Sequence, residues 1–257
     1  MVGINNENNT VGFWVDNNGN TFGFTHNFAG AFTSVSDPST PVTGTTVNQL
    51  LGVNDSFTAV GFYVDASGNA QAYIYSGGTF TGITLPASFN AAMTTATDIN
   101  NNGVISGFYV DTSGNTHGFV DNEGTFTSFD DPTGNGTNTM FLGLNDIGYL
   151  VGSYVDGNGM TNGLLYNINT GVWQTIDDPL QSATAAFGVT GTTVNGINDS
   201  NKLVGFYSDG TNVDGMLASP ILAPEPGSLA LAVAGLLGLA CFRKRNCAAP
   251  AAHQNGR

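Results

Sequence analysis

Basic side chains are almost missing from this chain. Only 5 lysines and arginines stand against 19 aspartates and glutamates, and charged residues of all kinds make up 9% of the sequence. Residues 1–223 hold 18 of the acids but a single base, Lys202. Because this acidic part would repel a phosphate backbone, we predict that the protein does not bind nucleic acid.

Cysteine and histidine are rarer still, with 2 and 3 residues. Both cysteines, Cys241 and Cys247, lie near the C-terminus, so no disulfide framework is expected in the residues before them. Neither His26 nor His117 stands in a motif that places it beside a nucleophile. Since Gly-x-Ser-x-Gly and His-Glu-x-x-His motifs are absent from the sequence as well, we predict that the protein is not an enzyme.

Glycine, by contrast, is abundant, and it opens a short motif that recurs five times. Each copy runs from glycine through aromatic and β-branched residues to aspartate. The copies are residues 12–16, 61–65, 107–111, 152–156 and 205–209. The leading glycines recur at intervals of 45–53 residues, a period typical of β-propeller blades.

Each repeat is predicted to form four β-strands, because apolar and polar residues alternate between turn-forming segments. In the second repeat the predicted strands cover residues 45–53, 59–64, 71–75 and 79–84, and later repeats have strands such as 125–129, 149–155 and 192–197. The repeats cover about residues 1–38, 45–86, 92–132, 137–179 and 190–219, and the last one lacks its fourth strand. The predicted fold class is all-β, with about five four-stranded repeats forming a β-propeller-like domain over residues 1–219, followed by one hydrophobic C-terminal helix.

The chain begins inside the first repeat. Only a short piece of a first strand follows Met1, and no signal-peptide segment stands there. This beginning favours a sequence that starts late, with the fourth strand of the fifth repeat and a signal peptide both upstream. The alternative is an open or loosely closed array of repeats.

In four repeats, a turn begins with an aspartate that is followed three residues later by glycine. Aspartate favours the first position of a type I turn, and glycine adopts the left-handed conformation that starts the return strand. The aspartates are Asp16, Asp65, Asp111 and Asp156. Their carboxylates are also weak candidates for binding calcium, although the loops lack the spacing and the distal glutamate of an EF-hand. Plain turns are the favoured interpretation, and no other metal or cofactor is predicted.

Aromatic residues recur in pairs on the strands before these turns. The set is Phe13, Trp14, Phe62, Tyr63, Phe108, Tyr109, Tyr154, Phe206 and Tyr207. Neighbours in a strand point to opposite faces, so one residue of each pair is expected to pack between blades. The other packs on a neighbouring blade or lies on a surface where it could stack on a sugar ring, and core packing is the favoured interpretation.

The repeats resemble the HAF family of extracellular β repeats. The resemblance rests on His117-Gly118-Phe119, on Gly196-Ile197-Asn198-Asp199 and on the Gly-x-Phe-Thr segment at residues 124–127, and it covers about residues 1–219. It implies a propeller-like fold and no defined chemistry.

The C-terminal residues have a different character. Pro224-Glu225-Pro226 lies in a linker at residues 220–227, and residues 228–242 carry no charge. As a helix, residues 227–242 would span about 24 Å at ~1.5 Å per residue, somewhat less than the ~30 Å hydrocarbon core. Arg243, Lys244 and Arg245 follow at once, and such a basic cluster stops transfer and favours the cytoplasmic side. We therefore predict a transmembrane helix at 228–242 and a basic cytoplasmic tail at 243–257.

This order of motif, apolar helix and basic cluster resembles the PEP-CTERM sorting signal of Gram-negative bacteria. The resemblance implies recognition by exosortase, with Pro224, Glu225 and Pro226 as the recognition element. It also implies export, transient anchoring in the inner membrane, and a final place in the cell envelope or outside the cell.

Together these features predict an exported, exosortase-sorted, non-enzymatic protein of the cell surface or extracellular matrix, associated with exopolysaccharide. Two alternatives remain open: an extracellular propeller enzyme acting on glycans or phosphate esters, and a calcium-dependent adhesin.

Overall fold

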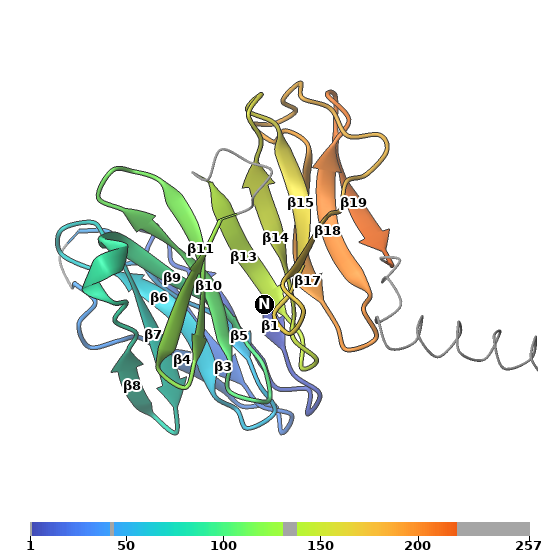
Figure 1. Ribbon diagram of the computed structural model, residues 1–257. Helices are drawn as coiled ribbons and strands as arrows, with labels where there is room; N and C mark the ends of the chain where they lie inside the picture. The colour runs from blue at the N-terminus through green and yellow to red at the C-terminus, as the bar shows by residue number, and fades with distance from the viewer. Residues whose placement is uncertain (1, 42–43, 131–137, 220–257) are drawn as a thin grey trace, which may run out of the picture. The chain divides into compact units, whose positions relative to one another are not determined.

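The computed structural model describes residues 2–41, 44–130 and 138–219, which fold into five antiparallel β-sheets (Figure 1). The chain divides into two units, Met1–Ser219 and Pro220–Arg257, and all five sheets belong to the first. The predicted linker, helix and basic tail at 220–257 lie outside the described residues. In the part that is described, no helix is long and apolar enough to cross a membrane.

Each sheet, called a blade below, is formed by strands that follow one another in the chain. Blade 1 contains β1 (Gly3–Ile4), β2 (Thr10–Val15), β3 (Thr21–His26) and β4 (Phe32–Val35). Blade 2 contains β5 (Asn48–Val53), β6 (Ala59–Val64), β7 (Ala70–Ser76) and β8 (Thr79–Gly82). A short 3-10 helix, η1 (Ala87–Phe89), leads into blade 3. Blade 3 contains β9 (Ala91–Ile99), β10 (Ile105–Asp111), β11 (Thr116–Asn122) and β12 (Thr125–Phe129).

The last two blades differ in size. Blade 4 contains β13 (Thr139–Leu144), β14 (Tyr149–Val155), β15 (Thr161–Asn167) and β16 (Val172–Thr175). Blade 5 contains β17 (Thr192–Ile197), β18 (Leu203–Ser208) and β19 (Val213–Ala218). Among the described residues, therefore, blade 5 has three strands, as the incomplete fifth repeat predicted.

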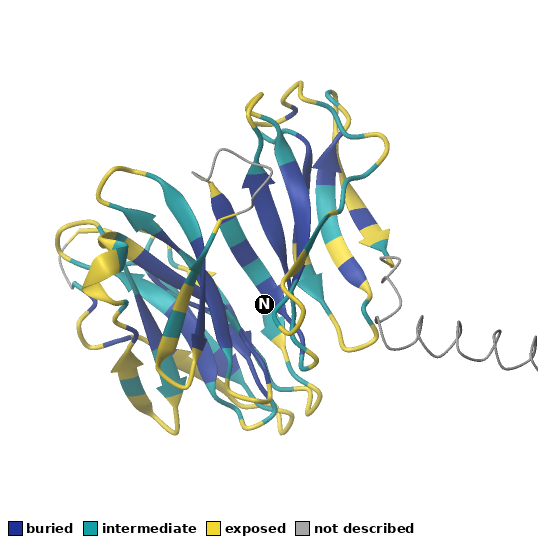
Figure 2. Ribbon diagram, viewed as in Figure 1, coloured by how far each residue is buried: buried dark blue, intermediate teal, exposed yellow. Residues whose placement is uncertain are grey.

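The apolar core lies between successive blades. Three clusters of buried side chains each draw members from two neighbouring sheets. Members from the two sides of each cluster are Val11 and Leu50, Val60 and Phe119, and Val120 and Phe141. The inner strands β5, β9, β13 and β17 also pack on one another in that order. This arrangement confirms the predicted β-propeller with five blades, and Figure 2 shows that its inner strands are largely buried while β8 is exposed.

The observed strands follow the predicted ones closely. Ala59–Val64, Thr125–Phe129, Tyr149–Val155 and Thr192–Ile197 have the predicted bounds. The strand predicted at 45–53 instead begins at Asn48. The reason is that Thr46 bonds to the preceding blade: its carbonyl accepts from Thr21 N at 2.8 Å and its N–H donates to Asn20 Oδ1 at 2.8 Å.

The structure also explains the glycine that opens the recurring motif. In blade 4 the pairing of β13 with β14 shifts register between Phe141 and Gly143, and Gly152 lies opposite this bulge. A Cβ at Gly152 would fall on the carbonyl oxygen of Met140 in the neighbouring strand. Equivalent glycines at 61, 107 and 205 face a carbonyl oxygen of the inner strand in the same way. A side chain at this point would force the two strands apart.

Candidate functional site

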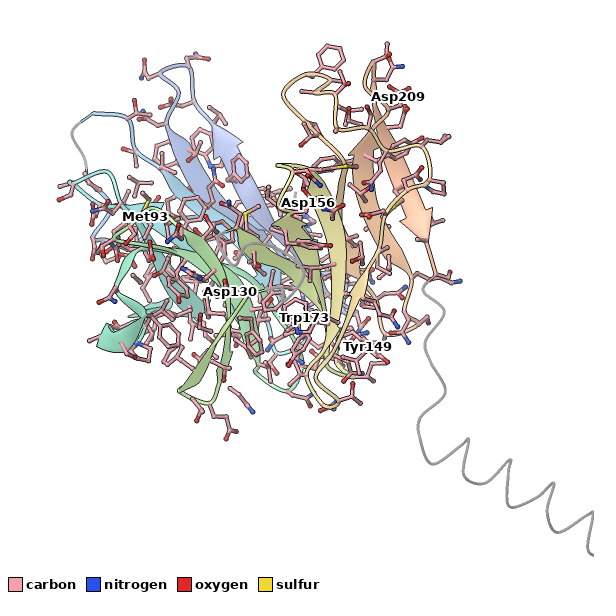
Figure 3. The ribbon with its side chains drawn as sticks, turned by 45° about the horizontal axis from the view of Figure 1, so that its top comes forward. Met93, Asp130, Tyr149, Asp156, Trp173 and Asp209 are labelled. Carbon is pink, nitrogen blue, oxygen red and sulfur yellow. The ribbon has the colours of Figure 1, made fainter. Side chains whose placement is uncertain are left out.

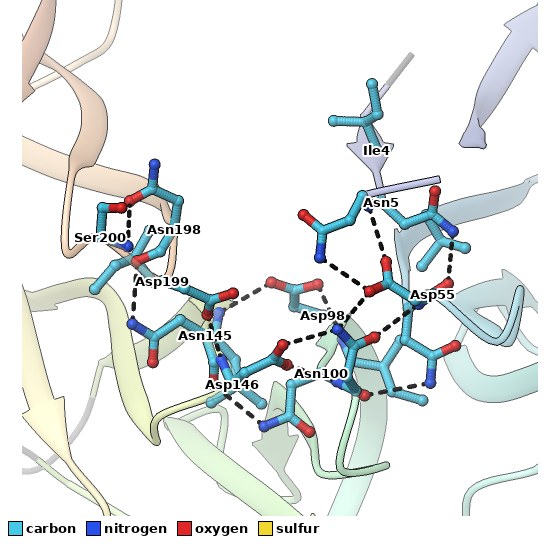
Figure 4. Close-up of a pocket in the computed structure, with 17 residues that line it drawn as sticks. Ile4, Asn5, Asp55, Asp98, Asn100, Asn145, Asp146, Asn198, Asp199 and Ser200 are labelled. Carbon is cyan, nitrogen blue, oxygen red and sulfur yellow. Dashed lines mark hydrogen bonds between the residues drawn. The ribbon is translucent and has the colours of Figure 1, made fainter. Parts of the chain in front are cut away.

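Five equivalent loops converge on one pocket at the end of the inner strands. Each inner strand ends in an apolar residue that is followed by Asn and then by Asn or Asp. The five segments are Ile4-Asn5-Asn6, Val53-Asn54-Asp55, Ile99-Asn100-Asn101, Leu144-Asn145-Asp146 and Ile197-Asn198-Asp199. Together with Asp98 and Ser200 they line a pocket of about 320 Å³, called the axial pocket below (Figure 4).

The first asparagine of each segment holds its own loop and the next blade. Asn54 Oδ1 accepts from Thr58 N at 3.0 Å, which closes the loop, while its Nδ2 donates to the carbonyl of Asn100 at 3.2 Å. The same interblade bond runs from Asn5 to Asn54 at 2.8 Å, from Asn100 to Asn145 at 3.2 Å and from Asn145 to Asn198 at 3.1 Å. We call this series the amide ladder. Aspartate could close the loop but has no donor for the interblade bond, so the position needs an amide.

The second residue of each segment forms a parallel series, called the side-chain ladder below. The backbone N–H of one blade donates to the side-chain oxygen of the next. The bonds run from Asn6 to Asp55 (2.8 Å), Asp55 to Asn101 (2.8 Å), Asn101 to Asp146 (2.7 Å) and Asp146 to Asp199 (2.8 Å). Asn101 Nδ2 also donates to Asp55 Oδ2 and to Asp146 Oδ2, both at 2.7 Å. Hydrogen bonds, chiefly from the Asn6 side chain, lower the pKa of Asp55.

Asp98 breaks the repeat at the centre of the pocket. The other four blades have glycine at this position, just before the apolar residue of the segment, and a Cβ at Gly52 would meet the Asp98 backbone at 2.6 Å. Asp98 Oδ1 accepts from Ile99 N and Oδ2 from Leu144 N, each at 2.9 Å. Burial raises the pKa of this carboxyl to about 7; the two N–H donors lower the pKa, and the charge of Asp146 raises it further.

The aspartates that were candidates for calcium lie in the β2–β3, β6–β7, β10–β11 and β14–β15 turns. Successive turns lie at opposite ends of the strands, so these turns point away from the axial pocket, and Figure 3 shows Asp156 and Tyr149 at opposite ends of β14. Asp111 Oδ1 accepts from Ser113 N and Asn115 N at 2.8 Å, and Gly114 has a φ of 90°. Within the described ranges, no group of three or more His, Cys, Asp and Glu side chains is placed to hold a metal ion.

Hydrogen bonds from the turns' own groups lower the pKa of all four aspartates. At Asp16 the largest contribution comes from the side chain of Asn20. At the other three aspartates it comes from a backbone N–H four residues later in the same turn, that of Asn69, Asn115 or Met160. These carboxylates therefore already serve as acceptors in plain turns, and calcium binding stays a prediction.

The two repeat histidines lie outside the axial pocket. His117 Nδ1 is 2.8 Å from Asp130 Oδ1, its Nε2 is 3.5 Å from Asp111 Oδ2, and its ring stacks on Tyr109 with centroids 4.9 Å apart. His26 packs on Phe32 with centroids 4.1 Å apart. Neither histidine is among the residues that line the pocket.

The recurring aromatic pairs divide as the strand geometry predicted in blades 3 and 5. Tyr109 and Tyr207 are buried, whereas their neighbours Phe108 and Phe206 are partly exposed. Trp14 is the most exposed of the set, at 46%, and it stacks on Phe22 with centroids 4.6 Å apart.

Sequence reasoning missed the axial pocket. The segment Gly196-Ile197-Asn198-Asp199 was recognised only as part of a repeat resemblance, although the Asn-Asp or Asn-Asn pair recurs in all five repeats. That recurrence was the available signal, because the equivalent loops of a propeller must meet around one axis.

The fold and this site define the first unit as a β-propeller, and solved structures of low sequence identity share the fold. A structure of TolB from Acinetobacter baumannii matches with a TM-score of 0.55 and 12% identity, covering 85% of this chain and 54% of that one. The chain thus spans about half the length of TolB. A structure of SapL1 lectin in complex with alpha methyl fucoside matches with a TM-score of 0.50 and 10% identity, covering 87% and 80%. No curated protein matches this chain.

The C-terminal residues identify how the protein is sorted. The family model of the PEP-CTERM protein-sorting motif matches residues 222–245, so the chain carries this signal, as predicted. The signal implies an exported protein that is processed by exosortase and located in the cell envelope or outside the cell.

Proposed function

We propose that this exported protein is a non-enzymatic binding protein of the cell surface or extracellular matrix, and that its axial pocket holds a neutral sugar unit of an exopolysaccharide. The observation that carries the proposal is the convergence of five amide- and carboxylate-bearing loops on one pocket. Its volume of about 320 Å³ lies at the lower end of the range for ligand sites, roughly 300–1,000 Å³.

The chemistry of the lining favours hydroxyl groups over anionic ligands. Amides both donate and accept hydrogen bonds, and carboxylates accept them, so together they suit the hydroxyls of a sugar. Four aspartates and no lysine, arginine or histidine line the pocket. This negative field disfavours a phosphate ester or an acidic polysaccharide, which argues against the enzyme alternative for phosphate esters.

The state of Asp98 supports binding rather than catalysis. Its raised pKa would suit a general acid, but each of its two oxygens already accepts a backbone N–H, from Ile99 and from Leu144. No histidine, lysine, cysteine or tyrosine of the described chain lines the pocket, so Ser200 and the aspartates are its candidate nucleophiles and proton-transfer groups.

A glycan array probed with the full chain tests this proposal, with and without calcium. We expect binding to neutral glycans in both conditions. Asp199→Ala should weaken it about tenfold, because Asp199 lines the pocket and one lost hydrogen bond to ligand corresponds to roughly 1.4 kcal/mol. Asp209→Ala is the matched control, since it removes the same charge from the turn at the other end of β18.

The array also separates the alternatives. Binding that needs calcium would support the adhesin instead, and equal losses in the two variants would place the ligand outside the axial pocket. An absence of binding to every glycan in both conditions would contradict the binding proposal.

The PEP-CTERM signal also supports proposals about recognition by exosortase, the stop of transfer and membrane anchoring. These steps need a test that is independent of the glycan array. Pro224, Glu225 and Pro226 are expected to form the element that exosortase recognises, Arg243, Lys244 and Arg245 to stop transfer, and residues 228–242 to anchor the chain transiently in the inner membrane. In a host with exosortase, tagged protein should be released with a shortened C-terminus, whereas a variant with alanine at 224–226 should keep its tail. Release of both forms at the same rate would contradict this assignment.

A further inference from the structure

The last blade presents a face that is built for a neighbour. In blade 4, Val151 and its cross-strand partner Leu165 are fully buried, and β14 and β15 pack on β17 of the next blade. The equivalent pair in blade 5 is Val204 and Leu217, which are 50% and 76% exposed. An apolar pair that is core in one blade is thus surface in the next.

The glycines on this face of blade 5 also have open space beside them. A Cβ at Gly163 of blade 4 would meet the Val194 side chain of blade 5 at 2.9 Å, and one at Gly143 would meet the Gly196 backbone at 3.0 Å. At the equivalent Gly215 no atom lies within 4 Å, and at Gly196 the one neighbour, Val204, belongs to the same sheet. Close approach of a further sheet is therefore possible here without any side chain in its way.

Blade 1 presents the complementary face. In blade 4, Trp173 and its partner Tyr166 pack on Phe129 of the preceding blade. The equivalent pair in blade 1 is His26 and Phe32, and Phe32 is 70% exposed.

Both hydrogen-bond ladders stop at the same place. Among the described residues, Asn198 Nδ2 and Asp199 N have no acceptor, although their equivalents in the earlier blades all donate to the next blade. On the other side, the carbonyl of Asn5 and Oδ1 of Asn6 receive no bond from a preceding blade. Figure 4 shows Asn198 and Ser200 on one side of the pocket and Ile4 and Asn5 on the other, and no dashed line runs directly from the first two residues to the second two.

We propose that the space between β17–β19 and β1–β4, called the seam, is the docking site of one further blade of this repeat type. The seam offers two donors and an apolar pair on one side, and two acceptors and an aromatic face on the other. These are the same groups that join blades 1 to 5, so the occupant continues an established interface. Direct contact of blade 5 with blade 1 would bury Leu217 and Phe32, which are exposed.

The occupant is defined by its chemistry. Its inner loop carries the apolar-Asn-Asp or apolar-Asn-Asn segment, so its asparagine carbonyl accepts from Asn198 and its second side chain accepts from Asp199 N. Its own amide and backbone N–H donate to Asn5 and Asn6. A large apolar side chain fills the space at Gly215. The occupant also adds a wall to the axial pocket, but its docking does not depend on sugar binding.

A six-blade variant of the full chain tests the proposal. A copy of residues 45–95 placed before Met1 adds the second repeat, and Thr95 then joins Met1 at the point where the repeat register continues, because Asp98 is equivalent to Gly3. We expect the melting temperature to rise by several degrees and the fluorescence of a hydrophobic dye to fall, since Val204 and Leu217 become buried.

Leu217→Asp provides the matched comparison in both chains. In the original chain it should leave the melting temperature unchanged, because Leu217 is exposed. In the six-blade variant it should cancel most of the rise. Equal effects of Leu217→Asp in the two chains would overturn the proposal: equally neutral effects would mean that no sheet docks in the seam, and equally large losses would mean that blade 5 already packs directly on blade 1.

Discussion

Asp98 gives the sharpest test of the electrostatics of the axial pocket. Its carboxyl has a folded-state pKa of about 7, well above the ordinary value of 3.8. Below the ordinary value the carboxyl is neutral in both the folded and the unfolded state. As pH rises, the unfolded chain ionises first while burial holds the folded carboxyl neutral, so the folded protein loses stability between about pH 4 and pH 7. Above that range the loss is constant.

The magnitude follows from the shift. About three pKa units correspond to ~4 kcal/mol, as an upper bound. The bonds from Leu144 N and Ile99 N favour the carboxylate and are already contained in that shift. The amide side chain introduced by Asp98→Asn is neutral at every pH. The free energy of unfolding of this variant, relative to that of the native chain, should therefore rise by up to this amount between about pH 4 and pH 8. Any bond that the amide fails to replace adds a constant offset.

Urea unfolding of the native chain and the variant at matched pH values measures the difference, in which the titrating groups that do not interact with Asp98 cancel. Asp16→Asn is the control with the opposite sign. Hydrogen bonds, first among them that of the Asn20 side chain, lower the pKa of Asp16, so its contribution to stability is present above the unfolded pKa and is lost as pH falls through the folded one. The free energy of unfolding of Asp16→Asn should therefore fall relative to that of the native chain as pH rises. Parallel stability curves for the native chain and Asp98→Asn from about pH 4 to pH 8 would refute the reasoning.

Two further predictions concern packing. Gly152→Ala should destabilise the protein by roughly 1–3 kcal/mol or more in urea unfolding, because its Cβ would fall on the Met140 carbonyl. Gly82→Ala is the control and should change stability little, because no atom lies within 4 Å of a Cβ there. Equal effects of the two substitutions would contradict the close approach of the strands at Gly152. Ser106→Ala should stabilise the protein by about 1 kcal/mol, since the buried Ser106 hydroxyl has no hydrogen-bond partner. Thr97→Val should destabilise it by about the same amount, because Thr97 Oγ1 donates to the carbonyls of Ser106 and Phe141. Changes of the same sign for both variants in thermal melts would contradict this assignment of hydrogen bonds.

The sequence predicted the strands because each one is short, alternating and bounded by a turn with its own chemistry. Asp111, for example, accepts the N–H groups of its own turn, and Gly114 takes the positive φ that begins the return strand, so both act within a few residues. Local rules of this kind can be read directly from a single repeat.

The roles of the axial residues could not be predicted from one repeat in isolation. The amide of Asn54 bonds a carbonyl 46 residues away, and the carbonyl that excludes a side chain at Gly152 belongs to the neighbouring strand. Asp98 lies near a strand end, as many polar residues of this sequence do, and its half-buried place in the pocket emerges only when the equivalent glycines of the other blades are brought around it. The seam is likewise a relation between the first blade and the last.

The order of Asn and Asp along the side-chain ladder accounts for how an acidic pocket stays folded. Asn6, Asp55, Asn101 and Asp146 alternate, so each of the two carboxylates faces amide donors, and Asn101 donates to both at once. Along the ladder, like charges become neighbours where Asp146 meets Asp199, and there the backbone N–H of Asp146 is the donor. A blade docked in the seam with Asn at its second position would place an amide beside Asp199, so that Asp146 and Asp199 stay the one pair of adjacent carboxylates along the ladder. The same repeat that fixes the blades therefore also spaces the charges along the ladder, and Asp98, whose carboxyl has a raised pKa, is the departure from the glycine of the other blades.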